Sequence, residues 1–194
     1  EPTYSRNTSY ISTSASNFCP TILYKSTIYA TGMVFFKDLE RINQKELRST
    51  GILKKMDFKE GGGFIVRPSA LSLKNFYGNM NGYSSTLNKN TLILAPYFCD
   101  ELILFDLDKQ TEKTITLQTR YGRLIKPLSP LNDISSFTNK QRNDYYKKSH
   151  TNIGLVYDKY KDIYYRFVRL PYAKPGPMDC SILVLNKNFK VISE

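Results

Sequence analysis

The sequence contains no tryptophan, one histidine and three cysteines among its 194 residues, and these shortages exclude several kinds of site. Cys19, Cys99 and Cys180 are far apart and form no CxxC pair, so neither a disulfide framework nor a zinc knuckle is indicated. We expect all three to be buried thiols. A catalytic Ser–His or Cys–His pair would have to use His150, whose lysine and polar neighbours favour a solvated surface position instead.

Long hydrophobic runs are also missing. The longest apolar stretch, residues 92–107, is interrupted by Pro96, Asp100 and Glu101, and a membrane-spanning helix needs roughly 20 apolar residues. No signal peptide is visible after Glu1, as is also true of a chain whose leader has been removed. We therefore expect a soluble chain with no transmembrane segment.

Acidic residues are fewer than basic ones. The chain has 17 Asp and Glu against 28 Lys and Arg, and its formal net charge is +11. A field of this sign attracts polyanions such as nucleic acid, anionic polysaccharide or a membrane surface. Aromatic residues are plentiful, at 15 Tyr and 11 Phe, and 41% of the chain is hydrophobic. A chain of this length and composition can bury a substantial core, which indicates a globular protein rather than a disordered one.

Short β-type runs separated by turn residues dominate the sequence, and helix signals are few. Residues 38–48 could form one short helix, and residues 139–148 could add one turn. The predicted strands are Ile22–Tyr24, Thr27–Phe36, Ile52–Met56, Phe64–Val66, Thr91–Tyr97, Leu102–Leu107, Lys113–Leu117, Ile153–Tyr157, Ile163–Arg169, Ser181–Leu185 and Phe189–Ile192.

These runs fall into three blade-like units, at about residues 20–68, 75–125 and 150–194. In each unit an Ile-Leu pair precedes an Asp or Asn turn. A four-stranded meander repeated at this period is typical of a propeller blade. We therefore predict an all-β fold of about three four-stranded antiparallel β-propeller-type blades, or half a propeller. A single β-sandwich or barrel is the alternative. Residues 1–17 are predicted to be a tail or edge segment, and residues 18–194 a single β domain.

The C-terminal strands also resemble a known family. The segment Tyr157–Phe167, followed by Ser181–Leu185 and Phe189–Ile192, is similar to the blade pattern of an uncharacterised family of six-bladed β-propeller lipoproteins from gut anaerobes, and Asp100–Gln118 is similar to it as well. The resemblance implies a location in the periplasm or at the cell surface and no established activity. A six-bladed member would be nearly twice as long, so this chain would hold about half a ring. It would then be a fragment, a truncated relative, or a protomer that completes a ring as a homodimer.

No motif selects a catalytic centre, a cofactor or a metal. Asp106 and Asp108 could offer two oxygen ligands to a hard cation, although such a pair more often closes a turn. The glycines of residues 61–63 precede a strand and not the helix of a phosphate-binding loop. An apolar neighbourhood would raise the pKa of a thiol such as Cys99 and leave it inert. We predict a protein that is not an enzyme and that binds no cofactor or metal.

Ligand binding is better supported, because basic residues alternate with aromatic ones in several places. Aromatic faces stack on sugars or bases, and guanidinium groups match carboxylate, sulfate or phosphate. The predicted ligand-binding residues are Arg120, Tyr121, Arg123, Tyr145, Tyr146, Lys147 and Arg166. For strand residues such as Arg166, the alternative is that Tyr and Phe pack inward while Arg points to water.

Two functions remain in view. The first is a non-enzymatic cell-envelope binding or scaffold module whose ligand is a glycan, a peptide or a partner protein, anionic ones included. The second is a nucleic-acid-binding protein, supported only by the net charge of +11 and the alternation of basic and aromatic residues. No helix-turn-helix, zinc-finger or RNP-type motif accompanies that charge.

Overall fold

The computed structural model describes residues 8–13, 20–36, 53–58, 64–69, 75–76, 83–121, 126–130, 137–172 and 178–194. The chain divides into two compact units. The first consists of Glu1–Ser16, Pro20–Phe76 and Leu128–Thr138, and the second of Asn17–Cys19, Tyr77–Pro127 and Asn139–Glu194. All strand pairs are antiparallel, and no sheet of the described residues closes into a barrel. The predicted all-β class is confirmed.

The first unit is built on a sheet in the order β1-β3-β4-β5, with β2 also paired to β3. Its strands are β1 (Thr8–Thr13), β2 (Ile22–Tyr24), β3 (Thr27–Phe36), β4 (Leu53–Phe58) and β5 (Phe64–Ser69). A two-stranded ladder joins β6 (Asn75–Phe76) to β11 (Ser129–Pro130). Among the described strands, β1 pairs only with β3, so it forms an edge of this sheet.

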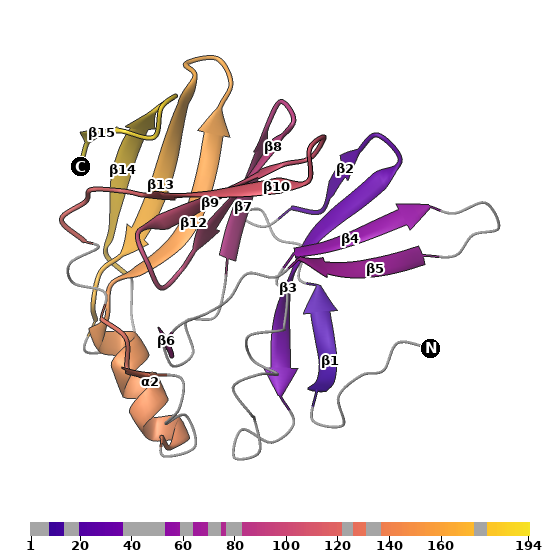
Figure 1. Ribbon diagram of the computed structural model, residues 1–194. Helices are drawn as coiled ribbons and strands as arrows, with labels where there is room; N and C mark the ends of the chain where they lie inside the picture. Colours follow the sequence, from indigo (N-terminus) through magenta and orange to yellow (C-terminus); the bar gives the residue numbers. More distant parts are fainter. Residues whose placement is uncertain are drawn as a thin grey trace. The chain divides into compact units, whose positions relative to one another are not determined.

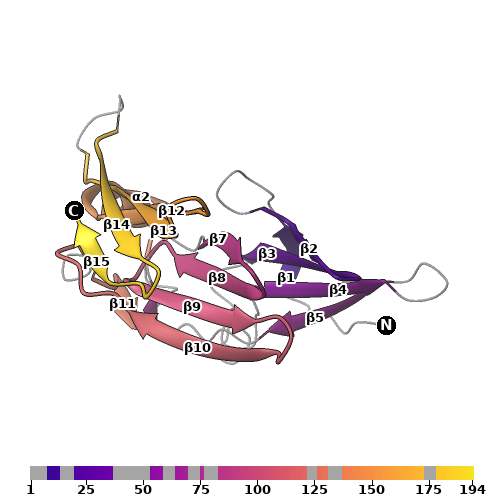
Figure 2. The same cartoon turned by 90° about the horizontal axis from the view of Figure 1, so that it is seen from above.

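The second unit begins with a four-stranded meander, which we call the first meander (Figure 2). It runs through β7 (Tyr83–Asn88), β8 (Thr91–Pro96), β9 (Glu101–Asp106) and β10 (Thr111–Thr116). The apolar strand β8 lies between β7 and β9 and is buried along most of its length. The polar strand β10 forms an exposed edge, where charged and threonine side chains discourage pairing with another chain.

The second meander follows helix α2 (Asn139–Lys148) and has the same consecutive order (Figure 1). Its strands are β12 (Thr151–Asp158), β13 (Ile163–Arg169), β14 (Cys180–Asn186) and β15 (Val191–Ser193). The alternation of apolar and polar residues along β14 buries Leu183 and Leu185 and leaves Ile182 exposed, as a sheet with one covered face requires.

The two meanders of the second unit bury a single hydrophobic core between them. Their first strands, β7 and β12, make the most extensive contact between the two sheets. The buried core consists of Ile93, Ala95, Leu102, Leu117, Tyr121, Leu155, Tyr164, Val168, Leu183 and Leu185. Each sheet therefore covers the apolar face of the other, which would otherwise be exposed to water.

Most predicted strands are confirmed within two residues at each end, whereas the strands β1, β6, β7 and β11 were not predicted. The serine-rich segment Tyr83–Asn88 was not predicted as a strand and forms β7, where Ser84 and Ser85 are buried. Helix α2 has ten residues, whereas a single helical turn was predicted there. The predicted helix at residues 38–48 and the glycines at 61–63 lie outside the described residues. Within the described chain, no helix is long and apolar enough to cross a membrane.

Candidate ligand-binding site

Polar side chains gather at both ends of the two meanders in the second unit. One end, which we call the loop end, carries the β8–β9 turn, residues 117–121 and helix α2. The other, the turn end, carries the short β7–β8, β12–β13 and β14–β15 connections, which lie together at the top of Figure 1. The two ends have different chemistry, and most of the predicted ligand-binding residues belong to the loop end.

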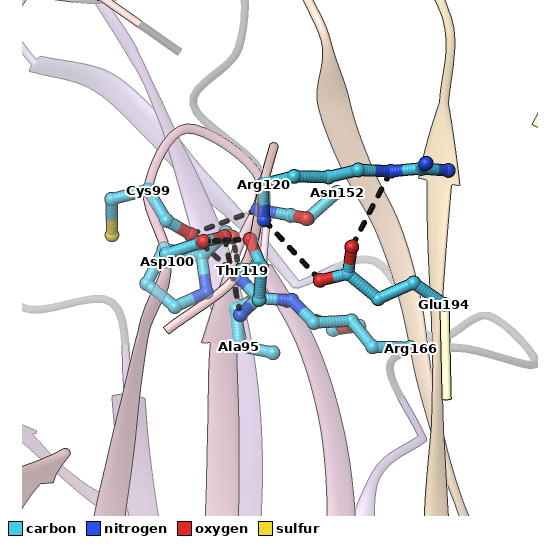
Figure 3. A network of polar contacts seen from close by, with 10 residues as sticks. Ala95, Cys99, Asp100, Thr119, Arg120, Asn152, Arg166 and Glu194 are labelled. Atoms are coloured by element: carbon cyan, nitrogen blue, oxygen red, sulfur yellow. Dashed lines mark hydrogen bonds and ion pairs between the residues drawn. The ribbon is translucent and has the colours of Figure 1, made fainter. Parts of the chain in front are cut away.

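Arg166 of β13 is the centre of the loop-end network, and its side chain is 0% exposed (Figure 3). Its Nη2 donates to the carbonyl oxygens of Pro96, at 3.1 Å, and Cys99, at 2.7 Å. Asn152 of β12 supports the same turn, since its Nδ2 donates to the Cys99 carbonyl oxygen at 2.8 Å. The second meander thus holds the β8–β9 turn of the first meander through buried hydrogen bonds.

A buried carboxylate partly balances the charge of Arg166. Nη1 of Arg166 lies 3.9 Å from Oδ1 of Asp100, whose other oxygen accepts a hydrogen bond from Thr119. Burial lowers the pKa of Arg166, and Asp100 opposes that shift. Arg166 still carries its proton at neutral pH, because a guanidinium holds it far more tightly than any other side chain. The hydrogen bonds that Arg166 donates to the Pro96 and Cys99 carbonyl oxygens are contacts with the main chain, which is a structural role.

Arg169, on the same strand, is also buried and closes the C-terminal end of helix α2. Its Nη2 donates to the carbonyl oxygens of Tyr146, at 2.5 Å, and Ser149, at 3.1 Å. Its guanidinium carbon lies 3.9 Å from the ring centroid of Tyr146 and 5.0 Å from that of Tyr172. A cation that satisfies the last carbonyls of a helix stabilises its C-terminus. The alternative in which the strand arginines point to water is therefore wrong for both Arg166 and Arg169.

The other predicted ligand residues have mixed environments. Arg120 is exposed but pairs with Glu194 at 3.3 Å, and its guanidinium lies over the ring of Tyr121 at 4.7 Å. Tyr121 itself is a core residue, 5% exposed. Tyr145 donates a hydrogen bond to the carbonyl oxygen of Lys126, and Lys147 lines a shallow pocket beside Pro171. Arg123 lies outside the described residues. Among the described residues, the loop end thus brings Arg120 and Tyr121 together, and Tyr146 with Arg169.

The candidate catalytic groups have environments that disfavour nucleophilic chemistry. Burial raises the pKa of Cys99 to about 11, so the thiolate is scarce at neutral pH, as predicted. Cys180 is exposed, which contradicts the expectation of a buried thiol, and Cys19 lies outside the described residues. His150 is half-buried against the ring of Tyr121, 5.4 Å between centroids, and not fully solvated as expected.

The carboxylates of Asp106 and Asp108 take part in the hydrogen bonds that close a turn. Oδ1 of Asp106 accepts hydrogen bonds from the backbone N–H groups of Asp108 and Lys109, both at 2.9 Å. Asp108 accepts one from Asn90 at 3.1 Å. This is the turn-closing role that the sequence offered as the commoner alternative. Among the residues that the structure describes, no three His, Cys, Asp or Glu side chains group as metal ligands would.

The turn end holds a cleft of about 550 Å³ between the two meanders, which we call the turn-end cleft. An aromatic stack lies at its base. Tyr164 of β13 packs between Tyr157 of β12 and Phe189 of the β14–β15 connection, with 4.8 Å between centroids on each side. Asn88 of β7 donates to the Tyr164 hydroxyl at 2.6 Å and so joins the first meander to the stack. The cleft therefore draws on both sheets.

Three lysines from three different turns line the turn-end cleft: Lys89, Lys159 and Lys187. The only acidic residue among its described lining residues is Asp162, whose carboxylate accepts a hydrogen bond from Tyr157 at 2.9 Å. All three lysine residues are exposed. The cleft is therefore positively charged, with asparagine amides and aromatic rings beside the charges.

Sequence reasoning missed the turn-end cleft, although a signal was present. The lysines lie next to asparagine or aspartate in the short turns, at Asn88-Lys89-Asn90, Asp158-Lys159 and Asn186-Lys187-Asn188. An Asp or Asn turn was used only to mark the end of a strand, and the lysines were not considered. Lysines in alternate hairpins of a meander, such as β12–β13 and β14–β15, are predicted to lie at one end of the sheet, because every second connection returns to the same end.

Comparison with known proteins supports the fold and nothing more specific. No protein-family model matches the chain, and the search of curated proteins found no match. A crystal structure of a member of the DUF4221 family from Bacteroides vulgatus matches 90% of this chain with a TM-score of 0.62 and 20% sequence identity. The match covers 50% of that protein, so the chain spans about half the length of its structural neighbour. A likeness to an uncharacterised family was expected and is confirmed at the level of fold, while its propeller and lipoprotein features stay predictions.

Proposed function

We propose that the chain is a non-enzymatic binding module of β-propeller type, with its ligand held at the turn end of stacked meanders. The observation that carries the proposal is the turn-end cleft, in which Lys89, Lys159 and Lys187 are brought together from three turns of two sheets. Loops and turns on a rigid sheet are the common place for binding residues, because the scaffold holds them without depending on their sequence.

The propeller arrangement is supported by how the two meanders pack. Each has four consecutive antiparallel strands, and the first strands, β7 and β12, make the main contact between sheets. Neighbouring propeller blades pack face to face in a similar way, each covering the apolar face of the next. A full ring would need further blades, and a second copy of this chain is the partner that the expected homodimer requires.

A place in the cell envelope is part of the same proposal. It is supported by the resemblance of the strand pattern from Tyr157 to Ile192 to envelope lipoproteins, and by the fold shared with a Bacteroides protein. The ligand classes open to such a module are a glycan, a peptide or a partner protein. The net charge of +11 favours an anionic one.

Nucleic acid is the second candidate ligand, and the lysine-bearing turns favour it as well. A labelled uronic-acid oligosaccharide, a labelled polyglutamate peptide and a labelled oligothymidylate separate the candidates when each is titrated at about 50 and about 200 mM salt. The proposed function expects saturable binding of the saccharide or the peptide that is tighter than binding of the oligothymidylate. Tightest binding of the oligothymidylate, with a steep salt slope, would support the second candidate. Absence of binding by all three probes at low salt contradicts both.

Light scattering on a sizing column tests the ring. A molar mass near 45 kDa, twice 22.4 kDa, is the expected result for two copies joined about a two-fold axis. A stable monomer of 22.4 kDa would remove the homodimer from the proposal. The ligand titrations do not depend on that outcome, because the turn-end cleft is formed within one chain.

A further inference from the structure

Two of the cleft lysines carry charge that no described residue balances. Among the described residues, neither Lys89 nor Lys187 has an ion-pair or hydrogen-bond partner for its side chain. The third, Lys159, lies over the ring of Tyr160 at 5.1 Å. Asp162, the one acid of the described lining, already accepts a hydrogen bond from Tyr157. The unbalanced charge favours an anionic group in the cleft.

Lys89 occupies a backbone position where other residues are preferred. Lys89 has a φ of 54° in the two-residue connection between β7 and β8. Hairpins favour glycine or asparagine at a left-handed position of this kind, because a Cβ atom there crowds the following carbonyl oxygen; glycine has no Cβ, and asparagine can hydrogen-bond to the nearby backbone. A lysine at this position therefore lowers the stability of the turn. It also adds an exposed ammonium group to the cleft.

The three residues of the aromatic stack also line this cleft. Phe189 also has a left-handed backbone, with a φ of 59°, in a turn held by hydrogen bonds from Asn188 and Lys190 to Oδ1 of Asn186. This conformation places the Phe189 ring on Tyr164. Because Tyr164 lies between the two other rings, Tyr157 and Phe189 each keep one face that Tyr164 does not cover.

Asparagine amides complete the lining. Asn88, Asn90 and Asn188 come from two different turns of the cleft. Each amide offers both a donor and an acceptor, which suits the paired donor and acceptor character of a sugar hydroxyl. Rings for the apolar face of a pyranose, amides for its hydroxyls and ammonium groups for an acidic substituent are thus present in one cleft.

We infer that the turn-end cleft binds an anionic saccharide, a sugar that carries carboxylate or sulfate groups. The inference rests on the proposed binding function and names its ligand class. The volume of about 550 Å³ lies in the usual range of small-ligand sites and bounds the ligand to a short oligosaccharide segment. A non-specific nucleic-acid site instead follows the backbone over several nucleotides in an extended basic groove.

The experiment is a calorimetric titration with four probes: an oligogalacturonate, a heparin-derived sulfated oligosaccharide, a neutral malto-oligosaccharide and inorganic tripolyphosphate. The first two distinguish carboxylate from sulfate, and tripolyphosphate tests charge without sugar. We expect one of the anionic oligosaccharides to bind more tightly than tripolyphosphate and the neutral sugar. The triple variant Lys89→Gln, Lys159→Gln, Lys187→Gln should weaken that binding at least about tenfold, since three charge-assisted contacts are lost.

A control variant removes a lysine outside the cleft. Lys140→Gln removes an exposed lysine of helix α2, which does not line the turn-end cleft, and should leave the affinity within about twofold. Folding of the triple variant is checked by its urea midpoint, because all three lysines are exposed and their loss should not unfold the protein.

Three outcomes overturn the inference. Tripolyphosphate that binds at least as tightly as the tighter-binding of the two anionic oligosaccharides shows a site for charge alone. Saccharide binding that survives in the triple variant places the site elsewhere; it also contradicts the turn-end site of the proposed function, although the protein still binds a ligand. When neither anionic oligosaccharide binds, the ligand class is wrong, and the polyglutamate and oligothymidylate titrations then decide separately whether the proposed function fails as well.

Discussion

Nη2 of Arg166, on β13 of the second meander, donates a hydrogen bond of 2.7 Å to the carbonyl oxygen of Cys99 in the first meander. The two residues are 67 positions apart in the chain. With the bonds from Asn152, this contact fixes the β8–β9 turn against the neighbouring sheet. The packing of the two meanders therefore depends on a buried cation as well as on apolar side chains.

Replacing Arg166 should destabilise the second unit strongly. Arg166→Met keeps much of the volume but leaves the Asp100 carboxylate, 7% exposed, without its cationic neighbour. We expect a loss of about 3–5 kcal/mol in the free energy of unfolding, the usual result of breaking a buried pair. Urea denaturation measures the loss.

Two further variants show whether the loss arises from Asp100. The double variant Arg166→Met, Asp100→Asn should recover part of the stability, because no buried charge is then left unpaired. Arg120→Met, in which an exposed pair with Glu194 is lost, should cost at most about 1 kcal/mol. Equal losses for Arg120→Met and Arg166→Met would contradict the structural role of Arg166.

Arg169 should control the stability of helix α2. Arg169→Gln removes the donor to the Tyr146 and Ser149 carbonyl oxygens and the cation between two tyrosine rings. We expect faster hydrogen exchange across residues 139–148, measured by mass spectrometry, because the helix loses its C-terminal partner. Lys140→Ala, which removes only an exposed pair with Asp144, should change exchange little. An unchanged exchange rate in Arg169→Gln would show that the helix does not need this anchor.

The titration of His150 should be directly visible, since it is the only histidine of the chain. Burial and the neighbouring charge of Arg169 lower its pKa from 6.5. An NMR titration should therefore place the midpoint below 6.5, and Arg169→Gln should raise it. A midpoint at or above 6.5 in the unmodified protein would contradict the half-buried position of the ring.

The lowered pKa of His150 also makes the stability of the folded protein depend on pH, and proton binding gives the sign. Between the lowered pKa and 6.5, the unfolded chain binds more protons at His150 than the folded chain does. The contribution of His150 to stability is therefore present above pH 6.5 and is lost as pH falls through the lowered value. Urea midpoints measured across that window should decrease with falling pH, and His150→Gln should remove this part of the decrease.

The described cysteines should differ sharply in reactivity. Cys180 is exposed, whereas burial raises the pKa of Cys99 to about 11. At pH 8 roughly one Cys99 side chain in a thousand is then a thiolate, the form that reacts with iodoacetamide. Peptide mass spectrometry after a short treatment should find Cys180 modified and Cys99 largely unmodified. Comparable labelling of both would contradict the burial of Cys99.

Much of the second unit could be predicted from residues alone. Alternating apolar residues and turn residues placed β8, β9, β12, β13 and β14 correctly, because hydrophobic periodicity and turn chemistry are local properties of the chain. Strand β7 was missed, since its serines lack the apolar alternation that identifies a strand. Ser84 and Ser85 are nevertheless buried beside β8, and Ser84 donates a hydrogen bond to the Ala95 carbonyl oxygen at 3.4 Å.

The sequence by itself determined the all-β class, the positive charge and the Asp/Asn-Lys turns, all of which depend on neighbours close along the chain. Only the tertiary structure decided which cations are buried and which are available. Arg166 and Arg169 lie inside because carbonyl oxygens from distant turns surround them, and the three cleft lysines lie together because two meanders pack face to face. Such contacts depend on how the sheets pack, and that packing cannot be predicted directly from the spacing of residues along the chain.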